Sequence, residues 1–175
     1  DIQYGNVRRP NHWNTSWDYA RFEVVGHRFA DLSEQNYGVA LLNDCKYGYD
    51  IKGNVMRLSL LRSGLKPDYE QDQGKHVFTY ALFPHEGDFA EGQVVQEASL
   101  LNDPMEVRKG KGQQEESSFI DSQNSKVEID AVKLTEDGKY LLCRFHEFAG
   151  STQQIKLKTS FKYEKWAESD LMERP

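Results

Sequence analysis

The sequence predicts a mainly β protein: an antiparallel β-sandwich with one short helix and a smaller C-terminal β segment. Two observations support this fold class. The 175 residues include 9 Tyr, 9 Phe and 3 Trp, and aromatic side chains favour strands over helix bundles. The apolar residues also come in short runs bounded by Gly, Asn and Asp, which is typical of strands joined by turns. A chain of this length buries about two thirds of its unfolded surface, so a substantial core is expected.

Residues 37–62 are the central feature, which we predict to be a β-hairpin with a long polar connection. Its apolar runs are residues 39–42 and 55–61. In the second run the alternating side chains place mainly apolar residues on one face, which should lie on a core. The connection carries two tyrosines, a lysine and two carboxylates, and loops on rigid sheets often hold binding groups. It is interpreted either as a binding loop or as a long hairpin whose tyrosines cover the sheet edge.

Residues 1–18 are rich in turn-forming residues and are expected to be extended. His12, Asn14 and Trp17 suit a sugar site, because planar polar groups bond to vicinal hydroxyls while an indole covers the C–H face of the ring. The alternative is a loop that is pinned by buried Trp13 and Trp17.

The elements that follow are expected from periodicity and turn residues. Alternation predicts a strand within residues 19–29 and another over residues 76–83, stopped by Pro84. Between them, Asp31 is placed to cap one helical turn over residues 31–36, and residues 62–75 form a polar loop. Residues 90–102 show the i, i+4, i+7 apolar spacing of one amphipathic helix that lies on the sheet.

The composition divides the chain into three regions. Residues 1–107 form a β-sandwich region with the central hairpin 37–62, and residues 108–118 form a Gly- and Glu-rich linker or mobile loop. Residues 119–175 form a C-terminal β-sandwich segment. In that segment we predict strands over residues 127–134, 140–148 and 155–161, with a tight turn over residues 136–139.

Charge and motifs exclude several functions. The net charge of −6 argues against nucleic acid or an anionic membrane surface as partner, because both require concentrated Lys and Arg. No apolar stretch approaches the ~20 residues of a membrane span, and two widely separated cysteines indicate a reducing compartment. The five histidines and the glycines form no metal, phosphate-loop, dinucleotide or serine-hydrolase motif. We therefore assign no catalytic residue and no metal ligand to this chain.

The chain begins within patterned sequence, so we interpret it as a fragment or excised domain of a longer protein. Its most specific stretches lie within residues 8–88: RRPNHWNTSWDYARFEV, HRFADLSEQNYGVALLNDCKYGYDIKGNVMRLSLLRS and PDYEQDQGKHVFTYALFPHEG. Together they closely resemble the C-terminal β region of class II α-mannosidases of glycoside hydrolase family 38, in its cytosolic and bacterial branch. The later stretches AVKLTEDGKYLLCRFHEFAG and ESDLME resemble the closing segments of the same region.

This resemblance implies a supersandwich of the galactose-mutarotase-like type. It further implies a retaining parent glycosidase that cleaves terminal α-linked mannose in the cytoplasm with a zinc ion, an aspartate nucleophile and a carboxylic acid catalyst. Those groups belong to an N-terminal α/β domain whose motifs are absent here, so the fragment alone should be inactive, with that domain as its partner. A homo-oligomer of the parent enzyme is compatible with the resemblance.

In such enzymes some loops of the β region approach the sugar cleft. Polar and aromatic density selects the candidates for contact with a mannoside: Asn43, Asp44, Lys46, Tyr47, Arg62, Asp72, His76, His12, Asn14 and Trp17. Two other functions stay open: an autonomous carbohydrate-binding module for mannose-containing glycans, and a packing domain without sugar contact.

Overall fold

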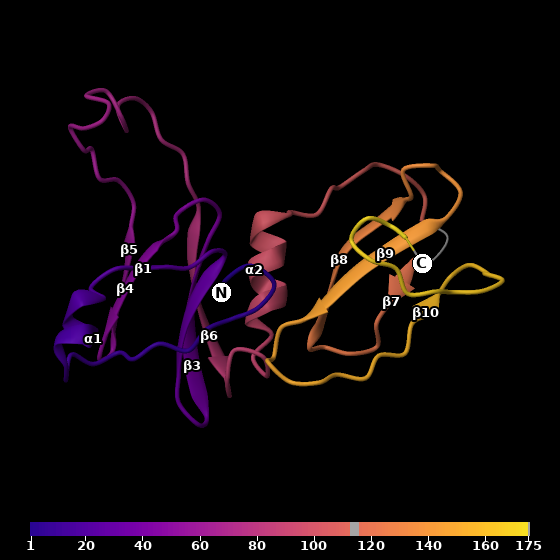
Figure 1. Ribbon diagram of the computed structural model, residues 1–175, viewed down its shortest axis with the longest axis horizontal. Coiled ribbons are helices and arrows are strands. Elements are labelled where there is room, and N and C mark those ends of the chain that lie inside the picture. The colour runs from indigo at the N-terminus through magenta and orange to yellow at the C-terminus, as the bar shows by residue number, and fades with distance from the viewer. Residues whose placement is uncertain (113–115, 175) are drawn as a thin grey trace. The chain divides into compact units, whose positions relative to one another are not determined.

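The computed structural model describes residues 1–112 and 116–174 of the chain. The prediction of a mainly β fold with antiparallel sheets is confirmed. The chain divides into two compact units, Asp1–Glu106 and Val107–Pro175 (Figure 1). Neither helix in the described part of the chain is long and apolar enough to cross a membrane.

Unit 1 contains two three-stranded antiparallel sheets. One has the order β1 (Val24–Val25), β4 (Gly48–Lys52), β5 (Val55–Ser59), and the other has the order β2 (Phe29–Ser33), β3 (Tyr37–Asn43), β6 (Tyr80–Glu86). Helix α2 (Val94–Asn102) packs on β2 and β3, on the side of their sheet away from β4 and β5 (Figure 1). The β2–β3–β6 sheet is thus the middle layer of unit 1.

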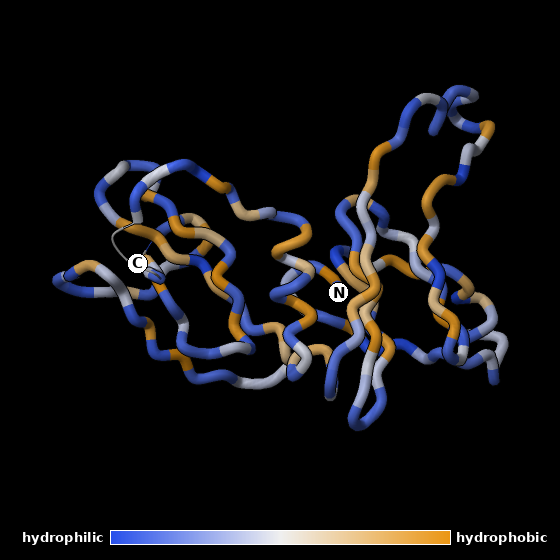
Figure 2. Tube along the Cα trace, turned by 180° about the vertical axis from the view of Figure 1, so that it is seen from behind, coloured by the Kyte–Doolittle hydropathy of each residue, from blue (hydrophilic) through white to orange (hydrophobic). Residues whose placement is uncertain are grey.

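The core of unit 1 follows from this layering. Ala40 and Leu42 of β3 are buried, as are Val94 and Ala98 of α2, because the sheet and the helix cover each other's apolar face. Hydrophobic residues accordingly concentrate along the strands and α2, and the turns are hydrophilic (Figure 2). The predicted helix is confirmed, although it begins at Val94 rather than at residue 90.

The prediction of a single hairpin over residues 37–62 is wrong. Its first run, β3, pairs with β2 and β6, and its second run, β5, pairs with β4 in the other sheet. The connection supplies β4 itself, and the true hairpin turns at Gly53 and Asn54. Gly53 has φ of 55°, as the first position of a type II′ hairpin turn requires. The alternation predicted for β5 holds over most of the strand, because Met56 and Leu58 are half-buried whereas Val55 and Arg57 are exposed.

Two expectations before β3 also fail. Asp31 does not cap a helical turn, because it lies in β2 opposite Ala40. The strand expected over residues 19–29 is limited to Val24–Val25, followed by the start of β2 at Phe29. Pairing with the strongly apolar β3 outweighs the weak local preference of a polar segment for a turn.

The third predicted strand is shifted along the chain. β6 begins at Tyr80 and continues through Pro84 to Glu86, so Pro84 does not stop it. The reason is its position at the edge of the sheet, where a missing backbone N–H breaks no ladder hydrogen bond.

The N-terminal segment contains an unpredicted helix, α1 (Ser16–Ala20). Thr15 and Asp18 form a reciprocal capping box at its start, which satisfies backbone N–H groups that have no partner inside the helix. The expectation of an extended segment is therefore wrong for these residues. The alternative with two buried tryptophans is also wrong, because the exposed fractions are 38% for Trp13 and 77% for Trp17.

Unit 2 is centred on the antiparallel pair β8 (Val127–Leu134) and β9 (Leu141–Glu147). The predicted turn between them is confirmed by bonds from Gly138 N to Thr135 O and from Thr135 N to Tyr140 O. β7 (Ile120–Asp121) and β10 (Lys158–Thr159) form a second small pair, so the strand expected over residues 155–161 is only two residues long. Of the predicted linker 108–118, residues 113–115 lie outside the described residues, and the rest has no helix or strand.

Candidate cleft-facing site

The turn between β3 and β4 is built on the side chain of Asn43. This amide is 1% exposed. Its Nδ2 donates to the carbonyl of His27 at 2.8 Å and to the hydroxyl of Tyr49, and its Oδ1 accepts from the amide of Lys46. Burial raises the pKa of Tyr49 to about 12. Asn43 was predicted to face a cleft, but it lies inside the unit and holds the turn in place.

Asp44 joins this turn to the segment that precedes β6. Its backbone N–H donates to the carbonyl of Thr79 at 3.2 Å, and its Oδ2 accepts from the amide of Thr79 at 3.0 Å. Hydrogen bonds from the thiol of Cys45 and then from Thr79 lower the pKa of Asp44. Asp44 is therefore an ionised anchor between two loops.

Three other candidate side chains gather at the same end of unit 1. The Nζ of Lys46 lies 5.0 Å from the ring centroid of Phe78, a cation–π contact. Asp72 Oδ2 accepts from the amides of Ser63 at 2.9 Å and Arg62 at 3.3 Å. These two bonds lower the pKa of Asp72, and the charges of His76 and Lys46 lower it further.

His76 completes this group through a contact of 2.9 Å between its Nε2 and the carbonyl of Asp72. We call Lys46, Asp72 and His76 the polar cluster. Asp72 and His76 lie on the long loop 60–79, and Lys46 lies in the turn between β3 and β4. The loop projects from unit 1 (Figure 1) and exposes apolar side chains such as Leu65 and Val77. The cluster thus combines a cation, a carboxylate and an imidazole beside exposed apolar surface.

Arg62 and Tyr47 lie at the rim of this region. Arg62 is exposed and contributes its backbone amide to Asp72. Tyr47 is half exposed, and its ring meets that of His27 edge to face at 5.6 Å. The connection was interpreted either as a binding loop or as a hairpin whose two tyrosines cover the sheet edge. Neither interpretation applies to Tyr49, because it is buried in the core.

The remaining candidates, His12, Asn14 and Trp17, do not join the polar cluster. His12 Nδ1 lies 3.5 Å from Asp18 and 3.4 Å from the amide of Asn14. The preceding residue Asn11 accepts from the amide of Gly53 at the turn of β4 and β5, whereas Lys46 precedes the opposite end of β4. The two groups are therefore separated by the length of the strand, roughly 17 Å at 3.3 Å per residue.

A cavity of about 530 Å³ lies beside this N-terminal group. Its lining includes Arg8, Arg9, His12, Trp13 and Arg21 together with residues of β2 and β4. Among the candidate residues only His12 reaches it. The N-terminal surface formed by His12, Asn14 and Trp17 is thus separate from the polar cluster.

Sequence reasoning missed the residues that assemble the polar cluster. Phe78 and Thr79 were assigned to a strand, and Ser63 to a polar loop, so no contact with Lys46, Asp44 or Asp72 was expected. The only available signal was the density of polar residues on both sides of the second apolar run. Their contacts depend on long-range loop packing, which local periodicity does not encode.

The chain matches known protein families over most of its length. Residues 1–70 match the C-terminal domain of glycosyl hydrolases family 38, and residues 126–175 match the C-terminal β-sandwich domain of the same family. Among its relatives, α-mannosidase G of Dictyostelium discoideum is 44% identical over 87% of this chain, and human α-mannosidase 2C1 is 42% identical over all of it. The chain spans only 14% and 17% of the lengths of these relatives.

A solved structure supports the same fold. The chain is similar to an α-mannosidase from Enterococcus faecalis V583 with a TM-score of 0.72 and 21% identity, covering 89% of this chain and 19% of that one. Two family matches and the aligned relatives agree in placing the sequence in one region of one family. The chain therefore belongs to glycosyl hydrolase family 38, as the C-terminal β domain of that family.

Proposed function

We propose that this chain is the part of an α-mannosidase that packs against the catalytic domain and completes its cleft for terminal α-linked mannose. The two relatives named above are α-mannosidases, and the chain spans less than a fifth of their lengths. The remainder of such a polypeptide supplies the nucleophile, the acid catalyst and the zinc ion of a retaining reaction. The parent enzyme acts in the cytoplasm.

The observation that carries this proposal is the polar cluster, in which Asp72 and His76 come from loop 60–79 and Lys46 comes from the turn between β3 and β4. The amides of Ser63 and Arg62 hold Asp72 in place and favour its ionised form, so it is a ready acceptor for a sugar hydroxyl. The ammonium group of Lys46 lies over the ring of Phe78 and can donate a hydrogen bond to a sugar hydroxyl. Aromatic rings also suit the C–H face of a sugar. The exposed apolar residues of the same loop provide contact area for the neighbouring domain.

The cluster binds and orients the substrate rather than reacting with it. A retaining glycosidase requires two carboxyl groups about 5–5.5 Å apart on either side of the bond. In Asp44 and in Asp72, backbone amides bind the Oδ2 oxygen and hold the carboxylate in a fixed position, which suits a fixed hydrogen-bond acceptor rather than a reacting group. We therefore give this chain no nucleophile and no acid catalyst.

One observation favours a second function, an autonomous carbohydrate-binding module. Trp17 and Tyr19 of α1 are both largely exposed, and Trp13 contacts Tyr19 edge to face at 5.3 Å. Exposed aromatic rings of this kind provide stacking surfaces for sugars. These rings belong to the N-terminal surface around His12, Asn14 and Trp17, which is separate from the polar cluster.

Calorimetry and an activity assay on the isolated 175-residue chain separate these functions. The chain should give no binding heat with mannose or mannobiose and should not hydrolyse an aryl α-mannoside, because the catalytic domain is not part of it. Hydrolysis by the isolated chain would contradict the proposal. Saturable heat that is lost in Trp17→Ala but kept in Lys46→Ala would establish the carbohydrate-binding module instead.

A further inference from the structure

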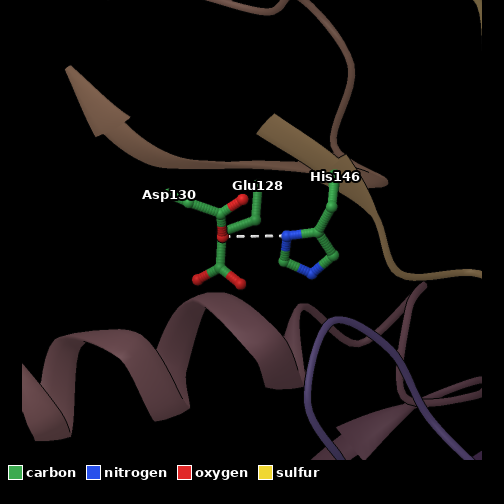
Figure 3. Close-up of side chains that lie close together, drawn as sticks. All are labelled: Glu128, Asp130 and His146. Carbon is green, nitrogen blue, oxygen red and sulfur yellow. Dashed lines mark hydrogen bonds and ion pairs between the residues drawn. The ribbon is translucent and has the colours of Figure 1, made fainter. Parts of the chain in front are cut away.

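Three side chains of metal-binding types meet on the β8–β9 hairpin of unit 2. One ligand atom from each of Glu128, Asp130 and His146 lies within 4.8 Å of the other two. His146 Nδ1 is 2.9 Å from Asp130 Oδ1 (Figure 3). Both of these side chains are mostly shielded, with exposed fractions of 17% for His146 and 18% for Asp130. We call these three residues the hairpin triad.

Strand register and a β-bulge bring the triad together. Glu128 of β8 lies directly opposite His146 of β9, so their side chains share one face of the hairpin. The pairing then passes from Ile129 directly to Ala131, and Asp130 is the extra residue of the bulge. Because a bulge changes the direction of the side chain it carries, it accounts for the contact between Asp130 and His146.

We propose that the hairpin triad binds one divalent transition-metal ion, with Zn²⁺ as the preferred occupant. Ligand atoms that are each about 2.0–2.2 Å from one ion lie roughly 3–4.4 Å apart. The observed limit of 4.8 Å therefore requires only small side-chain adjustments. An ion in this position replaces the hydrogen bond between His146 and Asp130, and it leaves at least one coordination position for water.

The chemistry of the ligands selects the class of ion. An imidazole nitrogen suits Zn²⁺, Ni²⁺ or Cu²⁺, whereas Mg²⁺ and Ca²⁺ prefer ligand sets of oxygen alone. The triad also brings two carboxylates together beside one imidazole. The imidazole can offset at most one of their two negative charges. Bringing two like charges together is unfavourable, and a divalent cation removes that repulsion.

An ion at this position would connect the two strands of the hairpin. Glu128 and Asp130 belong to β8, and His146 belongs to β9. The bound ion would therefore stabilise the folded hairpin relative to unfolded chains, in which His146 is not held close to Glu128 and Asp130.

Titration of the metal-free 175-residue chain with ZnCl₂ tests the proposal. Calorimetry should show saturation at one ion per chain, and the melting temperature should rise with Zn²⁺ but not with Mg²⁺. Asp130→Asn keeps the shape of its side chain and should weaken Zn²⁺ binding by at least about tenfold, as should His146→Ala. Glu136→Gln is the matched control, because it removes a largely exposed carboxylate from the turn of the same hairpin, and its affinity should equal that of the unmodified chain.

Co²⁺ provides a second readout that does not depend on stability. The Co²⁺-loaded chain should show visible d–d absorption that disappears in the His146→Ala chain, and circular dichroism checks that each variant is folded. If the folded, unmodified chain gives no saturable Zn²⁺ heat, the proposal is wrong. It is equally wrong if His146→Ala and Asp130→Asn both bind Zn²⁺ as tightly as Glu136→Gln.

Discussion

A single buried amide fixes the backbone of Lys46, one residue of the polar cluster. Asn43 contacts the carbonyl of His27, the hydroxyl of Tyr49 and the amide of Lys46. It therefore connects the end of β3 to β4 across the two sheets. A buried amide is costly unless its polar atoms are paired, and here both ends of the amide have partners. The position of the Lys46 backbone is thus set by the core.

The imidazole of His85 is a second buried polar side chain, and the residues around it are closely packed against its ring. Its Nε2 lies 2.8 Å from Asp31 Oδ1, and the side chain is 2% exposed. Two glycines leave room for the ring: a Cβ atom at Gly38 would lie 2.3 Å from His85 Cε1, and one at Gly92 would lie 2.3 Å from His85 Nδ1. β3, β6 and the segment before α2 are therefore fitted around one ring.

Adding a methyl group at either glycine should destabilise unit 1. We expect Gly38→Ala and Gly92→Ala each to lower the free energy of unfolding by about 1–3 kcal/mol, since the ring of His85 is enclosed and cannot move away. Urea denaturation measures the change. Gly110→Ala is the control, because no atom lies within 4 Å of its added Cβ and its effect should stay within about 0.5 kcal/mol. Equal midpoints for Gly38→Ala and Gly110→Ala would show that the ring is not confined.

At the scale of elements, the strongly apolar strands could be predicted, but strands β2 and β4 and the pairing of the strands could not. The apolar runs over residues 39–42 and 55–61 do form β3 and β5. Their placement in different sheets depends on two features: the two-residue turn at Gly53 and Asn54, and the pairing of β3 with β6. In the second, Asn43 pairs with Tyr80, which lies 37 residues later in the sequence. Local alternation specifies which face is buried, but it carries no information about such long-range partners.

Glu173 holds the C-terminal tail of unit 2 against the β8–β9 hairpin. Its Oε1 lies 2.7 Å from Lys133 Nζ, and its Oε2 accepts from the amide of Glu136 at 2.8 Å. The hydrogen bond from Lys133 is the main cause that lowers the pKa of Glu173, followed by that from Glu136. Because the pKa of Glu173 in the folded chain lies below its ordinary value of 4.5, this contact stabilises the fold above that value and weakens as the pH falls through the lowered pKa.

Removing this side chain should expose the amide of Glu136 to exchange. In Glu173→Ala we expect hydrogen exchange at this amide to accelerate about two- to fivefold at neutral pH, because a partly exposed ion pair at the surface contributes little to stability. The difference from the unmodified chain should shrink in acid, where Glu173 becomes protonated. Glu168→Ala, an exposed acid in the same tail, should leave the exchange unchanged. Acceleration of the same size in both variants would contradict the assigned contact.

At the scale of the whole molecule, the sequence was sufficient for the family and the fold class. Stretches within residues 8–88 carried a specific resemblance, and the family matches over residues 1–70 and 126–175 agree with it. The assembly of the sites was not predictable to the same extent. Asn43 was selected because it is polar, but only the structure reveals that it is buried. The hairpin triad has no spacing motif, because its ligands come from two strands and a bulge.

The central claim is that the polar cluster faces the mannoside in the assembled enzyme. It is tested most directly by the kinetics of the full-length parent enzyme on an aryl α-mannoside, comparing Lys46→Ala with Lys139→Ala, which removes an exposed lysine from the turn of the β8–β9 hairpin. We predict that Lys46→Ala lowers kcat/KM by about tenfold or more, as expected for a lost charged hydrogen bond, with an unchanged melting temperature, and that Lys139→Ala changes neither. Identical kinetics for the two variants at equal stability would contradict the account.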